Sequence, residues 1–217
     1  MPVRPAPWCL AALFLAVTGA ARAEPVRYAL DPVHTRVVFA VSHAGFSQAI
    51  GTVSGSTGEL DFDPADWTRT RLDVQVPLAR LDLGDAKWNR ATLAANLLDA
   101  TRHPHARFVS EHVEALADDS GRACGQLTLR GQTRPLCMDV TLNALKRHPM
   151  PPFRQTAGFS ATARLSRSDF GITAWPSMIG DEVELRIEAE AVRGRVRAPT
   201  EPAAAPTVDV PEPGETP

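Results

Sequence analysis

Histidines and cysteines are the residues of this 217-residue chain whose types and spacing could support chemistry. His103, His105 and His112 lie close together, and zinc sites need three or four converging ligands. Pro104 separates the first two, and no cysteine or acid joins them at ligand spacing, so we predict no metal site. Gly-x-Ser-x-Gly, His-Glu-x-x-His and phosphate-loop patterns are also missing from the sequence. We therefore expect a binding protein that needs no cofactor, and not an enzyme.

Two of the three cysteines, Cys124 and Cys137, flank a turn at Gly131 and sit on the polar side of their strands. A hairpin register that places them opposite one another would allow a disulfide. A slip of the register would separate them beyond bridging distance, so both outcomes stay open. A bridge here would be structural, because the spacing is not that of a Cys-x-x-Cys redox motif.

A set of apolar residues in alternating segments could line an apolar binding tunnel. Such a tunnel would hold an isoprenoid chain without charged contacts, since each buried carbon group contributes up to about 1 kcal/mol. Any single member is equally compatible with ordinary core, and only the set indicates a ligand. The predicted ligand-binding residues are Phe39, Val41, His43, Phe46, Leu60, Phe62, Val74, Val76, Phe108, Phe159, Phe170, Trp175, Ile179, Leu185 and Ile187.

His43 is the polar member of this set, and it shares the inward parity of Phe39 and Val41. Its ring could bond a quinone or phosphate head group, or it could be a buried histidine with a protein partner. Asp169 could contact a head group as well, although an acid that caps a turn is the interpretation we favour.

Strict alternation positions these residues, and it is clearest in VELRIEAEA, residues 183–191. Apolar and charged side chains alternate there, as in a strand with one dry and one wet face. The same pattern recurs along the chain, and turn residues separate the segments. The eight predicted strands lie within residues 28–41, 58–63, 71–81, 106–116, 124–131, 135–145, 158–166 and 183–191.

One segment, residues 84–100, predicts a helix, with Asp85 as its cap and Pro104 as its limit. Eight antiparallel strands with a helical crossover could close as a barrel or stack as two sheets. Small residues occupy several inward positions, and aromatics are only 6% of the chain, so we expect an unfilled apolar interior. These small inward residues are Ala161, Ala163, Ala189 and Ala191.

The ends of the chain differ from the middle. Residues 1–23 have the charged, apolar and Ala-x-Ala parts of a secretory signal peptide, so we expect cleavage after Ala23 and a periplasmic location. Residues 24–197 predict one domain, and 198–217 form a Pro/Ala/Glu-rich segment that cannot bury enough surface to order itself. The formal net charge is only −2, with no basic run, which argues against nucleic-acid binding.

Three groups of residues occur in a fixed order along the chain: Tyr28, Asp31, His34, Phe39 and His43, then Gly-x-Leu-Thr-x-x-Gly-x-Thr-x-Pro from Gly125 to Pro135, then Arg167 to Gly171. Together these landmarks resemble the YceI-like family of bacterial periplasmic lipid-binding proteins over about residues 26–193. The resemblance implies a lipocalin-like antiparallel barrel with a helix against it, and a long polyisoprenoid chain as ligand, as in some members. The crossover departs from the family pattern, with Gly84-Asp85 and Asn89-Arg90 where many relatives have Thr-Gly and Arg-Asp.

Together these features predict a periplasmic carrier of an isoprenoid-type amphiphile, such as a polyprenol derivative or a quinone. The predicted protein is a monomer or homodimer that makes transient contact with a membrane. The alternative is an interaction module, a filled barrel that engages a membrane redox or stress-response partner. A tunnel open at one end would favour the carrier, and a packed interior would favour the module.

Overall fold

The structure, a computed structural model, describes residues 24–194. The predicted signal peptide, 1–23, and the predicted disordered segment, 198–217, lie outside the described residues. The helices are α1 (Ala86–Leu93) and the short 3-10 turns η1 (Trp67–Arg69), η2 (Leu78–Arg80) and η3 (Ser168–Phe170). The strands are β1 (Val26–Leu30), β2 (Arg36–His43), β3 (Ser47–Ser54), β4 (Thr57–Phe62), β5 (Arg71–Pro77), β6 (Leu81–Asp82), β7 (His105–Ala117), β8 (Ser120–Leu129), β9 (Gln132–Arg147), β10 (Gln155–Ser166) and β11 (Ile179–Arg193).

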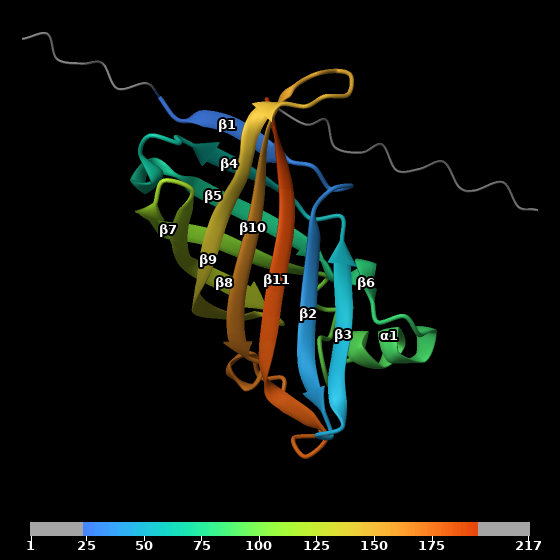
Figure 1. Cartoon of the computed structure of the whole chain (residues 1–217). Coiled ribbons are helices and arrows are strands. Elements are labelled where there is room, and N and C mark those ends of the chain that lie inside the picture. Colours follow the sequence, from blue (N-terminus) through green and yellow to red (C-terminus); the bar gives the residue numbers. More distant parts are fainter. Residues whose placement is uncertain (1–23, 195–217) are drawn as a thin grey trace, which may run out of the picture.

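Eight of these strands close into an antiparallel barrel, as the sequence predicts. The ring runs β1, β4, β5, β7, β8, β9, β10, β11, and pairing between β11 and β1 completes it. Figure 1 shows β9, β10 and β11 along the front and β1, β4, β5 and β7 crossing behind them. The fold is therefore mainly β, with a single α-helix among residues 24–194, and the prediction of fold class is confirmed.

The remaining three strands extend the sheet at one end. β11 changes partner along its length, since Ala191 to Arg193 pair with β1 and Val183 to Glu188 pair with β2. β2 then pairs with β3, and β3 pairs with the two-residue strand β6. We call the part sealed by β1 the closed end, and the part formed by the β2–β3 hairpin, α1 and the loop before β11 the open end (Figure 1).

The prediction of one continuous strand over 28–41 was wrong, because this segment forms two strands, β1 and β2, joined by a turn at 31–35. Asp31 builds this turn, since its carboxylate accepts the backbone N–H groups of Val33 and His34. The strand β3 was missed because its inward side chains are small. Gly51 lies under the ring of Phe39, and a Cβ there would stand 2.3 Å from Phe39 Cζ. A larger residue at this position would collide with the ring.

The predicted helix 84–100 begins as expected but is shorter. The Asp85 carboxylate caps α1 by accepting the N–H groups of Lys87 and Trp88. α1 ends at Leu93, and the chain then turns through hydrogen bonds from the N–H groups of Leu97 and Asp99 to the Ala94 carbonyl. This turn replaces the expected last helical turns, and it brings Leu97 to the cavity wall.

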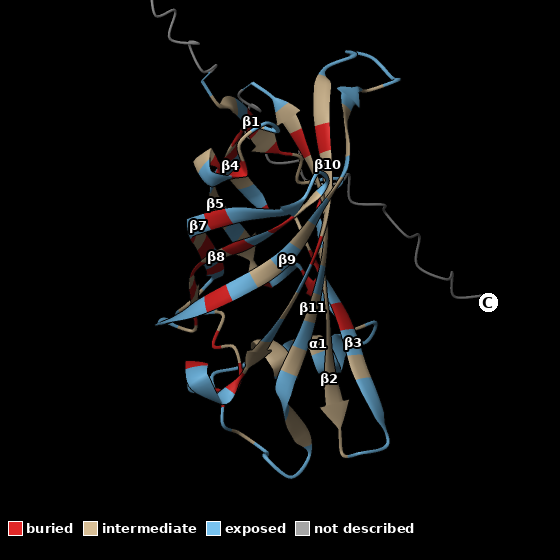
Figure 2. Cartoon of the chain, turned by 60° about the vertical axis from the view of Figure 1, so that its left-hand side comes forward, coloured by how far each residue is buried: buried red, intermediate tan, exposed pale blue. Residues whose placement is uncertain are grey.

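Buried residues form bands across the barrel wall, which Figure 2 shows in red. The outer faces carry cross-strand ion pairs, such as Arg27 with Asp61 on β1 and β4 and Arg107 with Asp73 on β7 and β5. The Arg27 hydrogen bond lowers the pKa of the Asp61 carboxyl. The charged rows identified in the sequence are thus the wet side of the sheet.

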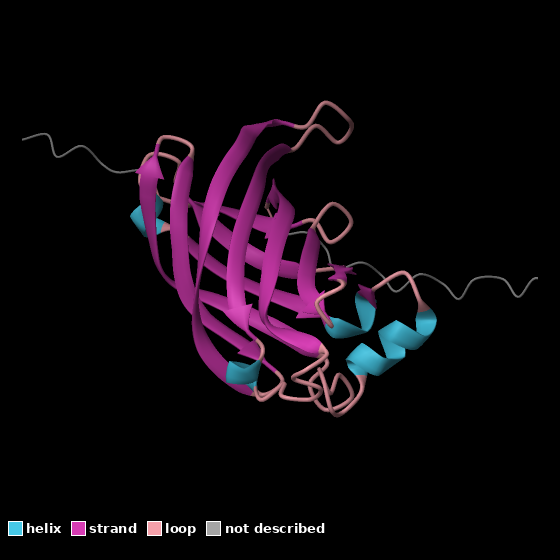
Figure 3. Cartoon of the chain, turned by 60° about the horizontal axis from the view of Figure 1, so that its bottom comes forward, coloured by secondary structure: helices cyan, strands magenta, loops and turns pink. Residues whose placement is uncertain are grey.

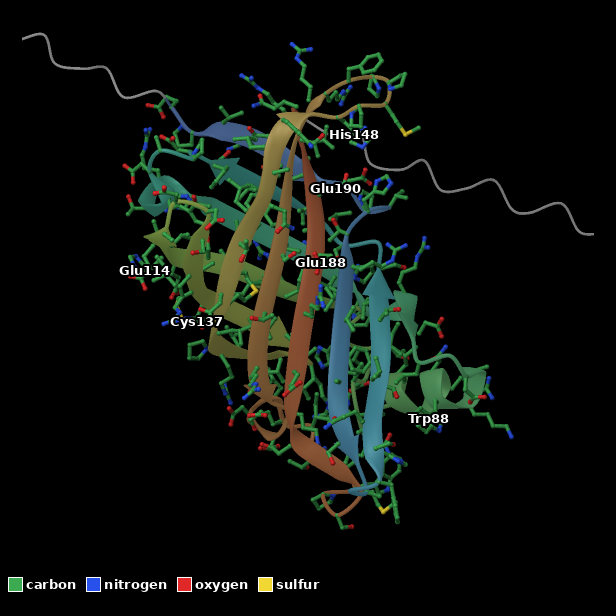
Figure 4. The ribbon with its side chains drawn as sticks, in the orientation of Figure 1. Trp88, Glu114, Cys137, His148, Glu188 and Glu190 are labelled. Atoms are coloured by element: carbon green, nitrogen blue, oxygen red, sulfur yellow. A yellow bond between two sulfur atoms is a disulfide. The ribbon has the colours of Figure 1, made fainter. Side chains whose placement is uncertain are left out.

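Cys124 and Cys137 lie directly opposite one another on β8 and β9 and form a disulfide, with 4.0 Å between their Cα atoms. The register that would have separated them is therefore not the one adopted. Cys137 lies on the outer face of β9, away from the barrel interior (Figure 4). The bridge therefore fastens the hairpin without entering the interior.

Candidate functional site

The barrel encloses an apolar cavity of about 670 Å³. It extends from Phe62 and Trp67 at the closed end to Trp88 and Trp175 at the open end. This volume and apolar lining are typical of sites for small amphiphilic ligands. Four of the five apolar side chains of VELRIEAEA line it, Val183, Leu185, Ile187 and Ala189, while Ala191 is fully buried in the packed core.

Most predicted binding residues lie on the cavity wall, because alternation fixed which side chains point inward. Whether they contact a ligand stays a prediction. The predicted residues that line the cavity are Phe39, Val41, His43, Leu60, Phe62, Val74, Val76, Phe108, Phe159, Trp175, Ile179, Leu185 and Ile187.

Phe46 and Phe170 do not line the cavity, and their prediction as wall residues was wrong. β2 ends at His43, and Phe46 follows the turn at Ala44 and Gly45, where its side chain is 92% exposed. Phe170 belongs to η3, where it packs into the core beside Leu136 and Ile172.

Aromatic rings seal the closed end. Phe62 packs edge-on against Trp67 and Phe159, with ring centroids 5.3 and 5.4 Å apart. Tyr28 is almost fully buried beside them, and this burial raises the pKa of its hydroxyl. Trp67 escaped prediction because it stands in a short turn between strands, outside any periodic pattern. These rings give the cavity a closed floor.

His43 and Trp88 meet at the open end, where their rings are 5.4 Å apart. β2 supplies the histidine and α1 supplies the tryptophan, so the helix forms part of the cavity mouth (Figure 4). A head-group contact by His43 stays a prediction. Asp169 lies in the first turn of η3 and is exposed, and it does not line the cavity.

Arg167 is a wall residue that the sequence interpretation missed as such. It is buried, and its guanidinium donates hydrogen bonds to the backbone carbonyls of Ile172, Ala174, Ile179 and Gly180, at 2.6 to 3.0 Å. The sequence did hold a signal for this role, because Arg167 continues the inward spacing of Ala163 and Leu165 by two residues. The arginine therefore fixes the loop 171–179 that borders the mouth.

Asp181 holds the other side of the same loop. Its carboxylate accepts hydrogen bonds from the Ser166 hydroxyl and from the Ser168 hydroxyl and N–H. The Ser166 hydrogen bond is the main cause of the lowered pKa of Asp181, and the Arg167 charge contributes. The loop is thus held by polar contacts of Arg167 and Asp181.

The polar content of the cavity wall is small. Among the lining residues, only His43 and Arg167 carry ionisable side chains. The buried hydroxyls of Thr35, Ser56 and Thr70 also line the cavity and have no hydrogen-bond partner within residues 24–194. They could donate to an oxygen atom of a ligand. The wall can thus hold an apolar chain with a few polar contacts.

The histidines considered as metal ligands do not converge. His105 and His112 are exposed on β7, and His103 stands against Gly131. Within residues 24–194, the one group with metal-ligand geometry is Asp31, His34 and Glu190, whose ligand atoms lie within 4.8 Å of one another.

The Asp31 group has a structural explanation in the turn between β1 and β2. The Asp31 carboxylate bonds the His34 ring at 2.8 Å, which raises the pKa of His34. Burial raises the pKa of Asp31, but the hydrogen bonds from His34 and from the backbone outweigh this effect and lower it. The ring and the carboxylate thus hold one another in the turn.

Comparison with known proteins identifies the chain. The model of the YceI-like domain matches residues 28–191. The chain belongs to the YceI-like family. A UPF0312 protein of Pseudomonas savastanoi pv. phaseolicola is 32% identical over 188 residues, which are 85% of this chain and 96% of that protein.

Two solved structures share the fold of this chain. BcnA of Burkholderia cenocepacia matches with a TM-score of 0.66 and 23% identity, over 74% of this chain and 98% of that one. A polyisoprenoid binding domain from Saccharophagus degradans matches with a TM-score of 0.58 and 11% identity, over 78% and 99%. Within residues 24–194, no helix is long and apolar enough to cross a membrane.

Proposed function

We propose that this YceI-like protein carries an isoprenoid-type amphiphile, a polyprenol derivative or a quinone, inside its barrel. The observation that supports this most is the apolar cavity of about 670 Å³ that is sealed at one end and reaches the surface at the other. Such a cavity removes a branched hydrocarbon chain from water, and the burial of each carbon group is favourable. The polyisoprenoid-binding domain of similar fold supports the same ligand class.

The proposal places the protein in the periplasm after cleavage of residues 1–23. The signal-like pattern of that segment supports this location, and the Cys124–Cys137 disulfide is compatible with an oxidising compartment. We include transient contact with a membrane, from which a ligand of this class would be loaded. The carrier acts without catalysis in this proposal, as a monomer or homodimer.

The cavity also favours the carrier over the two other functions considered, an interaction module and an enzyme. An interaction module requires a packed interior, and the volume of about 670 Å³ counts against it. An enzyme acting on a bound amphiphile would need several titratable groups facing the ligand. Among residues 24–194, only His43 and Arg167 line the cavity with ionisable side chains, and the Arg167 guanidinium already donates hydrogen bonds to four backbone carbonyls. Carriage therefore has the stronger support.

Ala161→Phe tests the proposal by filling the cavity. Ala161 lines the cavity on β10, whereas the neighbouring Thr162 points outward and is exposed. We expect Ala161→Phe to weaken binding of a quinone with an isoprenoid tail by at least about tenfold, because the ring displaces several chain carbons. Thr162→Phe should bind as the wild type does. Equal binding by both variants, with circular dichroism showing both folded, would refute a ligand inside the barrel.

A further inference from the structure

Large apolar side chains gather at the surface of the open end. Phe46 and Ile50 project from the β2–β3 hairpin, Trp175 and Met178 from the loop before β11, and Trp88 from α1, each at least 44% exposed. We call these five residues the apolar rim. Figure 3 brings this end forward and shows α1 and the loops beside the lower ends of the strands.

Contacts join the three elements that carry the rim at the cavity mouth, and Ile50 lies on the outer face of β3. The Ala44 N–H donates to the Met178 carbonyl at 2.6 Å, which joins the hairpin to the loop. The ring contact between His43 and Trp88 joins the hairpin to α1. Trp88, Trp175 and Met178 also line the cavity, so the apolar interior continues onto the exposed surface here.

The charge pattern of this end differs from that of the rest of the barrel. Residues 37–54 and 170–180 contain no Asp, Glu, Lys or Arg, although charged residues make up 22% of the chain. Other strands carry ion pairs on their outer faces, as Arg122 does with Asp139. Within α1, the two charged residues beside Trp88 are Lys87 and Arg90, both cations. The surface is thus apolar at its centre, and its α1 side carries the cations Lys87 and Arg90 together with the carboxylates Asp82 and Asp85.

We propose that the apolar rim docks on an anionic phospholipid bilayer and holds the cavity mouth against it. Tryptophan and other amphipathic side chains favour the membrane interface, and flanking cations are attracted to anionic head groups. An uncharged surface can enter the head-group region without the cost of burying a charge. This inference rests on the proposed function, because a membrane-resident ligand could then pass into the barrel without crossing water.

The opposite end provides a matched control. The β9–β10 hairpin exposes Met150 and Phe153, and Arg147 and Arg154 lie beside Phe153. It resembles the rim in apolar and cationic content, but it lies far from the mouth, as His148 and Trp88 show in Figure 4. Bilayer binding through general apolar or basic character would therefore use this hairpin as readily as the rim.

The experiment compares vesicle binding of the mature chain and two double variants. Phe46→Ser with Ile50→Ser alters the rim at positions that do not line the cavity, and Met150→Ser with Phe153→Ser is the control. Each protein is floated with vesicles of phosphatidylglycerol and phosphatidylcholine, and with phosphatidylcholine alone. We expect the wild type and the control to bind the anionic vesicles, and the rim variant to bind at least about tenfold more weakly.

Binding of a water-dispersible quinone with a short isoprenoid tail is measured in parallel, without vesicles. It should be unchanged in both double variants, which shows that they are folded and tests carriage separately from docking. Phe46→Ser alone, at a side chain that is 92% exposed, serves if the double variant loses probe binding. A rim variant that floats like the wild type would overturn the docking proposal.

Other outcomes would also overturn it. If the control loses vesicle binding and the rim variant keeps it, the opposite hairpin is the membrane contact. If the wild type ignores all vesicles but forms dimers that the rim substitutions dissolve, the rim is a contact between two copies of this chain. Failure of the wild type to bind the soluble probe would instead count against the proposed function.

Discussion

The closed and open ends of the barrel arise from the same alternating pattern but differ in packing. At the closed end, Tyr28, Phe62 and Trp67 are at most 4% exposed and fill the interior. At the open end, inward residues such as Val41 and Leu185 are only half-buried and face the cavity. Alternation thus decides which side chains point inward, while side-chain size and strand closure decide whether they meet one another.

The change of partner along β11 separates the two ends. β1 joins β11 to β4 and completes the ring, whereas β2 leads away to β3 and β6. The turn 31–35 marks this point, and the Asp31 N–H donates to the Glu190 carbonyl there at 2.8 Å. The packed closed end and the open mouth therefore need no second domain, because β2 takes over the pairing with β11 where β1 ends.

Truncation of wall residues at the two ends should give the largest contrast. We expect Phe62→Ala to lower the free energy of unfolding by about 3 to 5 kcal/mol, because it removes a packed ring. Leu185→Ala should cost about 1 kcal/mol, since its side chain is half-buried and faces the cavity. Urea unfolding followed by circular dichroism measures both. Equal losses would mean that the open end is packed as tightly as the closed end.

Loss of the disulfide should lower the stability of the whole barrel and should not act on the open or the closed end selectively. Cys124 and Cys137 are 13 residues apart, so a bridge between them constrains the unfolded chain by roughly 3 kcal/mol. The double substitution to serine should lower the free energy of unfolding by about that amount and leave quinone binding unchanged. A large loss of binding would show that the outer face of β8 and β9 shapes the cavity.

Arg167→Met should loosen the open end selectively. It leaves four backbone carbonyls without their donor, at a cost on the order of 2 kcal/mol. Hydrogen exchange should accelerate in the loop 171–179 and stay slow in β1 and β4. Arg164→Met, at an exposed position on β10 three residues before Arg167, is the control and should change neither region. Uniform acceleration in both ends would contradict a local role.

The Asp31–His34 pair should give the smallest effect, and one that depends on pH. The raised pKa of His34 means that its contribution is present below its unfolded pKa and is lost as pH rises through the folded pKa. Because the pKa of Asp31 is lowered, its contribution to stability is present above its unfolded pKa and is lost as pH falls through the folded pKa.

His34→Gln should therefore cost most in the mildly acidic range between these two pKa values. The loss should stay well under about 1 kcal/mol, because the His34 side chain is more than half exposed and solvent screens the pair. Unfolding from pH 4 to 9, with His105→Gln as the control, measures it. A loss that grows towards alkaline pH would contradict the assigned pair.

The sequence predicted the barrel well because alternation is a local signal. It placed Val183, Leu185 and Ile187 on the wall and placed the α1 cap at Asp85. It missed β3, whose inward residues Ala49 and Gly51 give no apolar period. Gly51 makes room for a ring on another strand, and such tertiary packing leaves little trace in the local pattern.

The candidate site was less accessible to sequence reasoning. Phe46 and Phe170 were misplaced because one follows a turn and the other lies in a 3-10 turn, where no strand alternation sets the direction of a side chain. Trp67 and Arg167 were missed as wall residues because both lie outside the strands, where alternation gives no direction. Their roles depend on how distant segments meet, which one sequence does not specify.

Native mass spectrometry of the protein purified without detergent tests the carrier function most directly. After mass measurement, organic extraction would identify what the barrel holds. We expect a stoichiometric adduct whose extracted components differ by isoprene units, and we expect it to be missing from Ala161→Phe and present in Thr162→Phe. A wild-type protein of apo mass, unchanged after incubation with quinones and polyprenols, would contradict the carrier function.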